Sequence, residues 1–353
     1  MTATTTGRGI IERYRSYLPV TPATPIVSLG EGDTPLLPSE RLSARVDAEV
    51  WLKYEGLNPT GSFKDRGMTL AISKVVEEGV GAVLCASTGN TSASAAAYAA
   101  RAGIVCGVLV PKGHVARGKL AQALVHGARV LEVDANFDTA LALTKQVVES
   151  RPVRLVNSTN PLRIEGQKTA AFEVVEALGR APDIHVMPVG NAGNITSYWR
   201  GYREAMSSGW SDGLPRMHGF QAEGADPIVR GEVIADPQTQ ASAIRIDAPA
   251  SWTGALQAAG ESGGAIGSVS DDEMIEMRAS LAAEGIFVEL ASAVGVAGLL
   301  RLSDAGRVSP GALVVCVLTG HGLKDADGVL PHVQGPRPVA ADVAAVTEAL
   351  GLA

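Results

Sequence analysis

The chain has 353 residues, a length that favours two domains over a single hydrophobic core. Its composition is that of a globular protein, with 46% hydrophobic and 19% charged residues. The net charge is −7 and the sequence has no basic stripe, which argues against nucleic acids and anionic membranes as partners.

From residue 50 onwards, short apolar runs alternate with stretches of helical periodicity. Strands are expected at 50–54, 82–86, 106–111, 128–133, 154–157, 184–189, 218–222 and 312–319. Helices are expected at 68–78, 92–102, 119–126, 137–150, 167–178, 195–207, 272–283 and 293–302. This alternation predicts an α/β fold with twisted, largely parallel sheets flanked by helices. Residues 225–267 are rich in Gly, Pro and Ser and show no clear pattern.

The expected elements suggest a division of the chain. We expect residues 50–150 to form a smaller domain and residues 1–49 with 151–330 to form a larger one. Residues 331–353 are expected to form a loose C-terminal tail.

The sequence also bears on the cellular compartment and on metals. Residues 1–18 lack the apolar segment of a secretory signal, and no apolar run is long enough to span a membrane. Cys85, Cys106 and Cys316 each lie in an apolar run, which indicates buried, reduced thiols. The six histidines form no metal-binding cluster, so no metal site is expected. We therefore expect a cytoplasmic protein.

Residues 58–67, Asn-Pro-Thr-Gly-Ser-Phe-Lys-Asp-Arg-Gly, join the first strand to the first helix. The proline and the first glycine predict a turn, and Ser62 is a candidate N-cap. Lys64 then lies in the first helical turn, where the helix dipole disfavours a positive charge. A neutral amine avoids that penalty, and lysines of low pKa form Schiff bases with carbonyl compounds such as pyridoxal phosphate (PLP). The alternative is a solvated surface lysine.

A second polar loop, residues 86–92, reads Ala-Ser-Thr-Gly-Asn-Thr-Ser and follows an expected strand. Its hydroxyls, its amide and its backbone N–H groups at a helix start suit a carboxylate ligand. An ordinary capped loop, with Thr88 or Ser92 as the N-cap, accounts for the same residues. Both interpretations stay open.

Two further loops follow expected strands. Residues 188–195, Pro-Val-Gly-Asn-Ala-Gly-Asn-Ile, precede a helix, and their two glycines let the backbone approach a ligand closely. We favour a phosphate site there over a plain glycine-rich turn. Thr319 ends the last apolar strand, within Val-Leu-Thr-Gly-His-Gly-Leu, and presents a hydroxyl at the sheet edge. Taken alone, it is explained as an ordinary strand-end threonine.

Two segments match known motifs only in part. Residues 113–119 have the spacing of a phosphate-binding P-loop, but Leu120 replaces the hydroxyl residue that would bind magnesium, which argues against an NTPase. Residues 260–264, Gly-Glu-Ser-Gly-Gly, follow a helix-like stretch, whereas a nucleophile elbow needs a preceding strand. We interpret this second segment as a loop.

Taken together, the four polar loops resemble the tryptophan-synthase-like (fold type II) family of PLP enzymes, in the family's order and over about residues 30–330. The resemblance implies that Lys64 carries the cofactor as a Schiff base and that Asn90 bonds its 3′ oxygen. It implies that the cofactor phosphate is held by Gly190, Asn191, Ala192, Gly193 and Asn194, and that Thr319 faces the pyridine nitrogen. It also implies that the substrate α-carboxylate is held by Ser87, Thr88 and Thr91.

Residues 157–169, Asn-Ser-Thr-Asn-Pro-Leu-Arg-Ile-Glu-Gly-Gln-Lys-Thr, discriminate best within that family. They resemble the segment that binds the substrate phosphate in the members acting on O-phospho-L-homoserine, which implies phosphate binding by Asn157, Ser158 and Arg163. Amide, hydroxyl and guanidinium groups after a strand are anion-binding groups, although a capped loop with a surface arginine is the alternative. The chain departs from many relatives after Glu289, where leucine replaces proline in Glu-Leu-Ala-Ser-Ala.

The resemblance implies a PLP-dependent lyase that converts O-phospho-L-homoserine and water to L-threonine and phosphate, the final step of threonine biosynthesis. It also implies a homodimer. Lys64 would remove the Cα proton, and water would add at Cβ after the γ-phosphate leaves. A threonine or serine dehydratase of the same fold shares the cofactor loops but needs no substrate-phosphate site. A non-catalytic PLP- or nucleotide-binding module is the alternative from another class, and Lys64 argues against it.

Overall fold

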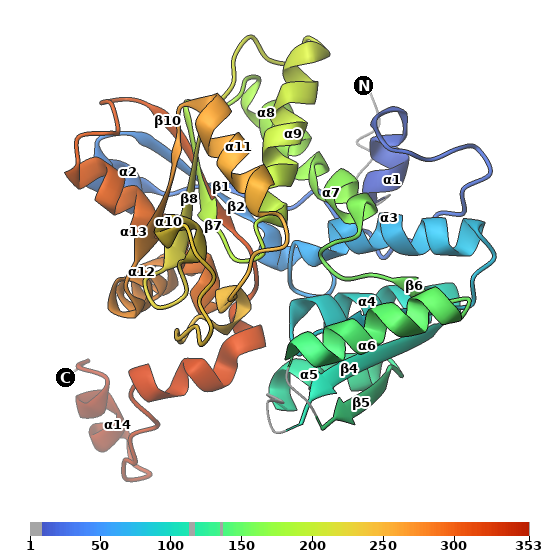
Figure 1. Cartoon of the computed structure of the whole chain (residues 1–353). Helices are drawn as coiled ribbons and strands as arrows, with labels where there is room; N and C mark the ends of the chain where they lie inside the picture. Colours follow the sequence, from blue (N-terminus) through green and yellow to red (C-terminus); the bar gives the residue numbers. More distant parts are fainter. Residues whose placement is uncertain (1–8, 113–116, 135–136, 353) are drawn as a thin grey trace, which may run out of the picture.

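The computed structural model describes residues 9–112, 117–134 and 137–352, and its strands form two sheets (Figure 1). The larger sheet has six strands in the order β1-β2-β10-β7-β8-β9. Their bounds are Leu36–Pro38 (β1), Glu49–Tyr54 (β2), Leu313–Leu318 (β10), Ile184–Pro188 (β7), Arg216–Ala222 (β8) and Ala265–Val269 (β9). Neighbouring strands pair in parallel except β1, which is antiparallel to β2.

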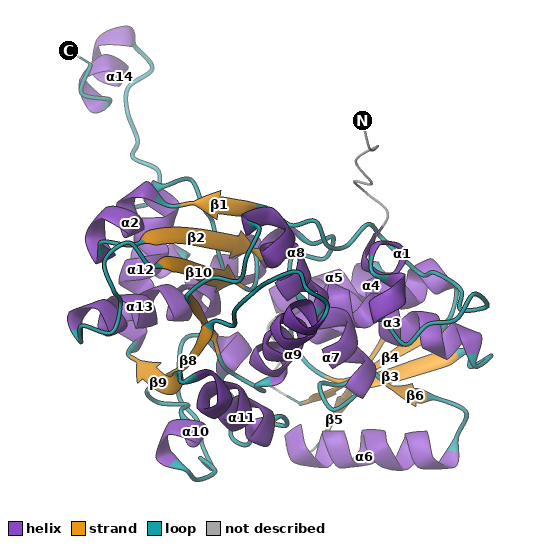
Figure 2. Ribbon diagram, turned by 90° about the horizontal axis from the view of Figure 1, so that it is seen from above, coloured by secondary structure: helices purple, strands orange, loops and turns teal. Residues whose placement is uncertain are grey.

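The smaller sheet has four strands in the order β5-β4-β3-β6, all parallel. Their bounds are Arg129–Val133 (β5), Val105–Pro111 (β4), Ala82–Ala86 (β3) and Arg154–Leu155 (β6). Figure 2 shows α6 (Phe137–Ser150) on one face of this sheet and α3 (Lys64–Glu77) with α4 (Asn90–Ala102) on the other. The alanine-rich α4 lets its backbone pack closely, and it shares an apolar core with α3 and with α5 (Arg117–Val125).

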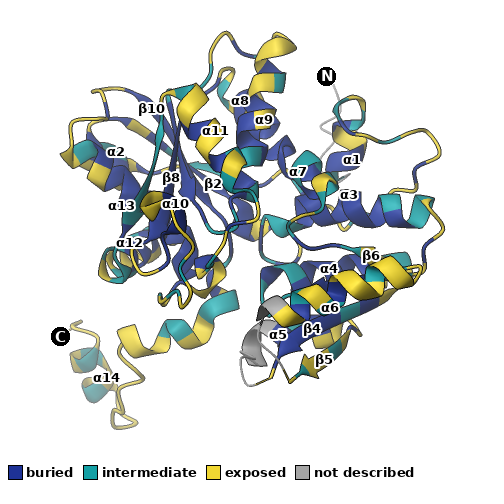
Figure 3. Ribbon diagram, in the orientation of Figure 1, coloured by how far each residue is buried: buried dark blue, intermediate teal, exposed yellow. Residues whose placement is uncertain are grey.

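Helices cover both faces of the larger sheet, so its central strands are apolar on both sides (Figure 3). Along β10, Val314, Cys316 and Leu318 enter one core, whereas Val315 and Val317 enter the other. The first core is closed by α2 (Glu40–Val46), α12 (Asp271–Ala283) and α13 (Leu290–Asp304). The second is closed by α1 (Gly9–Arg13), α8 (Thr169–Leu178), α9 (Gly193–Ser207) and α11 (Trp252–Ser262).

The remaining elements are short. They are α7 (Pro161–Gln167), α10 (Pro227–Arg230), α14 (Val343–Ala349) and the 3-10 helices η1 (Arg15–Tyr17), η2 (Glu55–Leu57), η3 (Ser242–Ile244), η4 (Gly322–Gly328) and η5 (Leu330–His332). The segment that carries α14 extends away from the body of the protein (Figures 1 and 2). None of its residues is buried.

The structure confirms the predicted α/β fold with largely parallel sheets, and three local expectations change. The helix expected at 167–178 is α8, which begins at Thr169, and a separate helix that the sequence did not predict, α7, directly precedes it. Residues 225–267, which showed no pattern, hold α10, α11 and β9. The loop expected at residues 260–264 begins within α11, which ends at Ser262, and leads into β9. Helix precedes strand here, so the order is the opposite of a nucleophile elbow, as expected. Part of the P-loop-like segment, residues 113–116, lies outside the described residues.

The expected domain boundaries assign two strands to the wrong sheet. Residues 50–54 belong to the larger sheet, because β2 pairs along its length with β10. Residues 154–155 belong to the smaller sheet, because β6 pairs with β3. We propose that the smaller domain runs from about residue 63 to 156, and that the larger one comprises the rest of the chain up to about residue 330.

Candidate active site

The polar loops singled out from the sequence follow the carboxyl ends of strands in both sheets. The loop after β2 is joined to the end of β10, since Phe63 N donates to Thr319 O at 3.1 Å and His321 N donates to Gly61 O at 3.0 Å. Ligands of parallel sheets bind outside this edge, where strands pass into helices. The Asn90 side chain, which follows β3 of the smaller sheet, donates to Glu289, whose backbone N–H donates to Gly320 O beyond the end of β10. The ligand-binding edges of the two sheets therefore meet at a common site.

Lys64 is the first residue of α3, four residues earlier than the expected helix start. Its N-cap is Phe63 without a side-chain capping bond, so the predicted cap at Ser62 is wrong. The Ser62 Oγ is buried and has no hydrogen-bond partner among the described residues. The backbone turns at Gly61, whose φ of 83° favours glycine. This turn places a partly buried lysine at a helix start, as the sequence predicted.

The electrostatic surroundings of Lys64 favour the neutral amine. Burial lowers its pKa to about 7 from an ordinary 10.5, and the charge of Arg163 acts in the same direction. The carboxylate of Glu289 opposes them and raises the pKa. The Nζ atom lies 4.0 Å from the centre of the Phe63 ring. A substantial fraction of the amine is therefore unprotonated near neutral pH, as a Schiff-base lysine requires.

Arg163 reaches the same region because α3 and α7 cross at two glycines. A Cβ atom on Gly67 would lie 2.8 Å from the Arg163 carbonyl oxygen, and one on Gly166 would lie 2.1 Å from the Arg66 carbonyl oxygen. No side chain fits between the helices at these points. The two backbones therefore touch, and Arg163 lies beside the helix start that carries Lys64.

Arg163 is a buried cation without a carboxylate partner among the described residues. Only 1% of it is exposed, its Nη1 donates to Val156 O at 3.2 Å, and its Nε has no partner. Burial lowers its pKa to about 10. Because an unpaired buried charge is costly, such a residue is expected to have an anionic ligand.

The loop before α7 is held by Asn157, which uses both ends of its amide to do so. Its Nδ2 donates to Ala86 O at 2.9 Å, and its Oδ1 accepts from Ala86 N at 3.0 Å. These bonds join the end of β6 to the end of β3. The partly buried Ser158 follows directly. In this structure Asn157 therefore orders the loop, while Ser158 and Arg163 make no hydrogen bond to another side chain among the described residues.

The glycine-rich loop after β7 has the features of a phosphate site. Ala192 adopts a left-handed conformation, with a φ of 62°, and directly precedes α9. Within the described part of the chain, the backbone N–H groups of residues 190–194 have no acceptor. The Asn194 Nδ2 is also buried and has no hydrogen-bond partner in that part of the chain. Asn191 holds the loop in place, since its Oδ1 accepts from Ala250 N at 3.2 Å. Unpaired donors at a helix start suit a phosphate.

The loop after β3 ends at Asn90, the first residue of α4, and differs from the expected capping. Gly89 is the N-cap and makes no side-chain capping bond, so neither Thr88 nor Ser92 caps this helix. Instead, the Ser92 Oγ donates to Gly89 O at 2.8 Å, and the Ser87 Oγ accepts from Gly89 N at 3.2 Å. Ser87, Thr88 and Thr91 are partly buried at this helix start.

Thr319 directly follows β10, at the carboxyl edge of the larger sheet, and is 5% exposed. Its Oγ1 lies 3.1 Å from the Ser292 Oγ, which accepts a bond from Gly320 N at 2.9 Å. This arrangement orients a neutral hydroxyl at the edge of the sheet, where the sequence placed it.

Sequence reasoning missed Glu289, which directly precedes α13. Only 2% of it is exposed, and it accepts a hydrogen bond from the Asn90 side chain at 2.9 Å. The available signal was an acidic residue directly before a helix of small, apolar residues. Such a position predicts a buried carboxylate, and a buried carboxylate needs a polar partner.

Other candidate chemistry lies outside this region. The three cysteines are free and buried, as predicted, and burial raises the pKa of Cys106 and Cys316 to about 12. No group of three or more potential metal ligands occurs among the described residues. In the same part of the chain, no helix combines the length and the apolar character needed to cross a bilayer.

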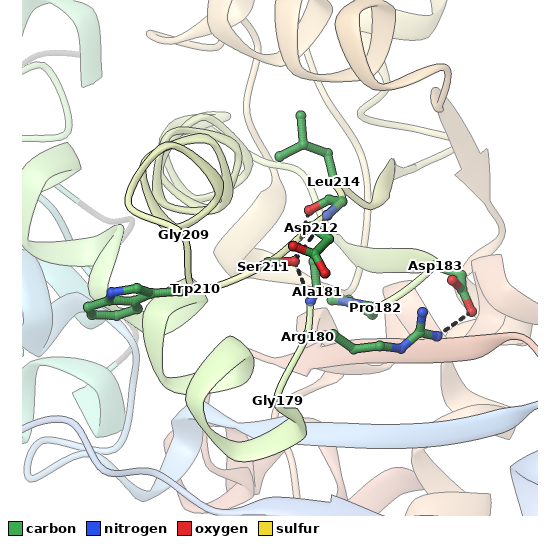
Figure 4. A pocket seen from close by; sticks show the side chains of 11 residues that line it. Gly179, Arg180, Ala181, Pro182, Asp183, Gly209, Trp210, Ser211, Asp212 and Leu214 are labelled. Carbon is green, nitrogen blue, oxygen red and sulfur yellow. Dashed lines mark hydrogen bonds and ion pairs between the residues drawn. The ribbon is translucent and has the colours of Figure 1, made fainter.

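A pocket of about 420 Å³ lies at the opposite edge of the larger sheet (Figure 4). It is lined by residues 179–183, which lead into β7, and by residues 209–214, which lead towards β8. Arg180 at its rim pairs with Asp183 at 2.9 Å. This pocket therefore faces the amino ends of the strands, away from Lys64 and the polar loops.

The residues present fit a PLP cofactor. Lys64 has the lowered pKa of a Schiff-base lysine, and the loop at residues 190–194 offers unpaired donors for a phosphate. Candidate anion-binding groups therefore come from two elements, Arg163 from α7 and the glycine-rich loop before α9.

Comparisons with known proteins agree with this geometry. Residues 27–320 match the family of pyridoxal-phosphate dependent enzymes. The threonine synthase of Mycobacterium leprae is 55% identical over 98% of this chain and 96% of its own length. That of Synechocystis sp. is 58% identical over 91% of this chain and 84% of its own.

Solved structures share the fold. Maize serine racemase superposes with a TM-score of 0.73 at 21% identity, covering 92% of this chain and 98% of its own. Threonine deaminase isoform 2 from Solanum lycopersicum gives a TM-score of 0.75 at 20% identity, covering 92% and 94%. At these identities the likeness concerns the fold alone. The family match and the two threonine synthases together show that the chain belongs to the pyridoxal-phosphate dependent enzymes and, within them, to the threonine synthase group.

Proposed function

We propose that this enzyme is a threonine synthase that uses PLP to convert O-phospho-L-homoserine and water to L-threonine and phosphate. The observation that carries the proposal is the 55% identity to a threonine synthase over 98% of the chain. The buried Arg163 beside Lys64, which has no carboxylate partner in the described part of the chain, supplies the chemical reason, because it offers a second anion site next to the cofactor lysine.

Lys64 is the catalytic residue in this proposal. PLP, when bound, supplies a carbonyl for the lysine amine and a conjugated ring that withdraws electrons from the substrate. With a pKa near 7, the Lys64 amine is available both to bind the cofactor and to accept a proton from the substrate Cα.

The cofactor is held by groups from both sheets. The N–H groups of residues 190–194 at the start of α9 would bind its phosphate, and the Asn90 amide would bond its 3′ oxygen. The Thr319 hydroxyl would face the ring nitrogen. Because this hydroxyl is neutral, it does not stabilise a proton on that nitrogen as a carboxylate would.

The substrate is held by two further sets of groups. Arg163 and Ser158 bind its phosphate, and Asn157 positions the loop that carries Ser158. The arginine contributes charge-assisted hydrogen bonds, which are the strong ones at phosphate sites. The α-carboxylate binds at the start of α4, where Ser87, Thr88 and Thr91 provide hydroxyls beside the helix N-terminus.

The presence of two anion sites favours this function over a dehydratase. Backbone donors at residues 190–194 suffice for the cofactor phosphate. A buried arginine at a second site is then superfluous unless the substrate itself carries an anionic group in addition to its carboxylate. Dehydratases acting on threonine or serine have no such substrate group.

The homodimer and the cytoplasmic location expected from the sequence stay predictions. Light scattering of the purified protein tests whether it is a dimer.

The experiment that tests the function is a substrate comparison with purified, PLP-loaded protein. With O-phospho-L-homoserine, we expect phosphate and L-threonine to form in equal amounts. With L-threonine or L-serine, formation of the 2-oxo acid should be much slower. Rapid 2-oxo acid formation without phosphate release from O-phospho-L-homoserine would identify a dehydratase instead.

A further inference from the structure

A buried contact joins Glu289 to Asn90 across the two halves of the molecule. The Asn90 Nδ2 lies 2.9 Å from one carboxylate oxygen of Glu289 and 3.1 Å from the other. Glu289 is 2% exposed and Asn90 is 7% exposed, so water competes little for this contact. Asn90 begins α4 on the smaller sheet, whereas Glu289 precedes α13 on the larger one. The contact therefore links the two sheets directly beside the site.

The chemistry of this pair fixes which way the amide of Asn90 is turned. An ionised carboxylate can only accept hydrogen bonds, so it selects the NH₂ end of the amide and excludes the carbonyl oxygen. An amide NH₂ carries two N–H bonds in one plane. When one N–H is directed at Glu289, the direction of the other is fixed by covalent geometry.

We propose that Glu289 is a positioning residue, which orients Asn90 so that its second N–H is presented to the 3′ oxygen of PLP. This inference rests on the proposed role of Asn90 within the proposed function. The ionised 3′ oxygen is an acceptor, so it needs a donor from the protein. An amide turned the other way would offer a carbonyl oxygen, and two acceptors would face each other.

The position of Glu289 is itself well determined. Its backbone N–H donates to Gly320 O at 3.1 Å. It lies at the N-terminus of the 15-residue α13, where the helix dipole stabilises a carboxylate. A Cβ atom on Gly320 would lie 2.2 Å from a Glu289 carboxylate oxygen, so only glycine leaves room for this rotamer. Gly320 directly follows Thr319, which ties the carboxylate to the strand end that carries the proposed pyridine partner.

The test measures cofactor binding without any substrate. Cofactor-free Glu289→Ala, Glu289→Gln, Asn90→Ala and the alanine double variant are titrated with PLP, and the dissociation constant and the visible absorbance spectrum are recorded. Loss of one charge-assisted hydrogen bond should weaken PLP binding roughly tenfold in either alanine variant, with the same spectral change. The double variant should bind no more weakly than Asn90→Ala, because Glu289 acts through Asn90. Glu289→Gln should recover most of the affinity, since its amide oxygen still accepts the bond.

Two further variants keep the test decisive. Glu284→Gln removes another partly buried carboxylate, one that accepts a bond from Ser39 at 2.8 Å, and should bind PLP normally. Gly320→Ala should displace the Glu289 side chain and reproduce the spectral change of Glu289→Ala. This variant tests the inference independently if the Glu289→Ala protein does not fold. The inference is overturned if the Glu289 and Asn90 effects add, or if Gly320→Ala or either alanine variant leaves the PLP spectrum unchanged. The PLP titrations use no substrate, so their outcome does not depend on whether the enzyme releases phosphate from O-phospho-L-homoserine. Failure of the positioning role and failure of the proposed function are therefore distinguishable.

Discussion

Gly166 of α7 lies against the backbone of Arg66 in α3, where a Cβ atom would come within 2.1 Å of the carbonyl oxygen. The facing residue Gly67 is equally tight, because its Cβ would lie 2.8 Å from the Arg163 carbonyl oxygen. Arg163 is one helical turn before Gly166, and Lys64 is one turn before Gly67. The contact between two glycine-bearing helices therefore sets the separation of Lys64, the proposed catalytic residue, and Arg163, the proposed phosphate ligand.

This contact predicts that Gly166→Ala is harmful to both stability and activity. Overpacking at a backbone contact should lower the free energy of unfolding by about 1–3 kcal/mol and reduce kcat/KM, because Arg163 is pushed from its place. Urea unfolding and steady-state kinetics measure the two effects. Gly260→Ala is the control, since Gly260 also lies in a helix but nothing lies within 4 Å of its added Cβ. Equal stability of the two variants would contradict the close crossing.

Lys64 should be the residue that binds PLP covalently. Borohydride reduction of the PLP-loaded protein, followed by peptide mass spectrometry, should place the modification on Lys64. The Lys64→Ala protein should show no such adduct. An adduct on any other lysine of the unmodified chain would refute the central assignment of the site.

The reactivity of Lys64 should also depend on pH in a specific way. Its pKa is lowered to about 7, first by burial and then by the charge of Arg163. Below that pH the amine is protonated and unreactive, and above it the amine is neutral. In cofactor-free protein, labelling of Lys64 by an amine-reactive reagent should therefore rise through about pH 7. A labelling midpoint near the ordinary 10.5 would contradict the buried electrostatic environment.

Thr319 should tune the cofactor with a neutral hydroxyl. Thr319→Ser keeps that hydroxyl and the contact with Ser292, so most of the activity should remain. Thr319→Asp introduces a negative charge that favours a protonated ring nitrogen. We expect this variant to change the visible spectrum and to increase side products relative to L-threonine. A normal spectrum and a normal product ratio in Thr319→Asp would remove this residue from the site.

A buried ionic cluster behind the Lys64 helix should contribute strongly to stability. Glu173 accepts hydrogen bonds from Lys53 and from Arg66, each at 2.7 Å, and all three residues are nearly inaccessible to solvent. Glu173→Gln leaves the buried Lys53 and Arg66 without the negative charge of Glu173. This loss should lower the free energy of unfolding by about 3–5 kcal/mol. Glu276→Gln, which removes an exposed partner of Arg45, should change stability little.

Acid should weaken the same cluster. Burial alone would raise the pKa of Glu173, but the charges of Arg66 and Lys53 hold it well below its ordinary 4.5. The unfolded chain therefore takes up the proton first as the pH falls below about 4.5, and the stability from the cluster is lost progressively. The stability difference between Glu173→Gln and the unmodified chain should narrow in that range. A constant difference from pH 7 to pH 3 would contradict this interpretation.

The sequence predicted the order of strands and helices well, because parallel strands and their flanking helices have strong apolar periodicity. It also located Lys64, the glycine-rich loop and Thr319, since polar residues stand out directly after apolar strands. The predicted cap at Ser62 was wrong because Phe63 forms the N-cap without a side-chain bond. The start of this helix is fixed by a contact with the end of another strand, since Phe63 N donates to Thr319 O. Local sequence propensity does not reveal such a contact.

What the sequence could not predict depends on long-range contacts. The pair Glu289 and Asn90 is separated by 199 positions, and only the folded chain brings the two side chains together. The glycine contact between α3 and α7 has the same origin. Asn157 carried an anion-binding signal, but the structure uses its amide to hold the backbone of Ala86. Residue type alone does not distinguish a side chain that binds a ligand from one that orders a loop.

The central claim is that Arg163 serves a phosphate on the substrate, and Arg163→Met tests it most directly. Methionine fills similar space without a charge, and because Arg163 has no carboxylate partner among the described residues, the variant should be at least as stable. PLP affinity and the visible spectrum should hardly change. The kcat/KM for O-phospho-L-homoserine should fall roughly tenfold to a hundredfold, the value of one charge-assisted contact. Turnover of unphosphorylated L-serine or L-threonine, however slow, should be much less affected. Equal losses on both kinds of substrate would contradict the phosphate role of Arg163.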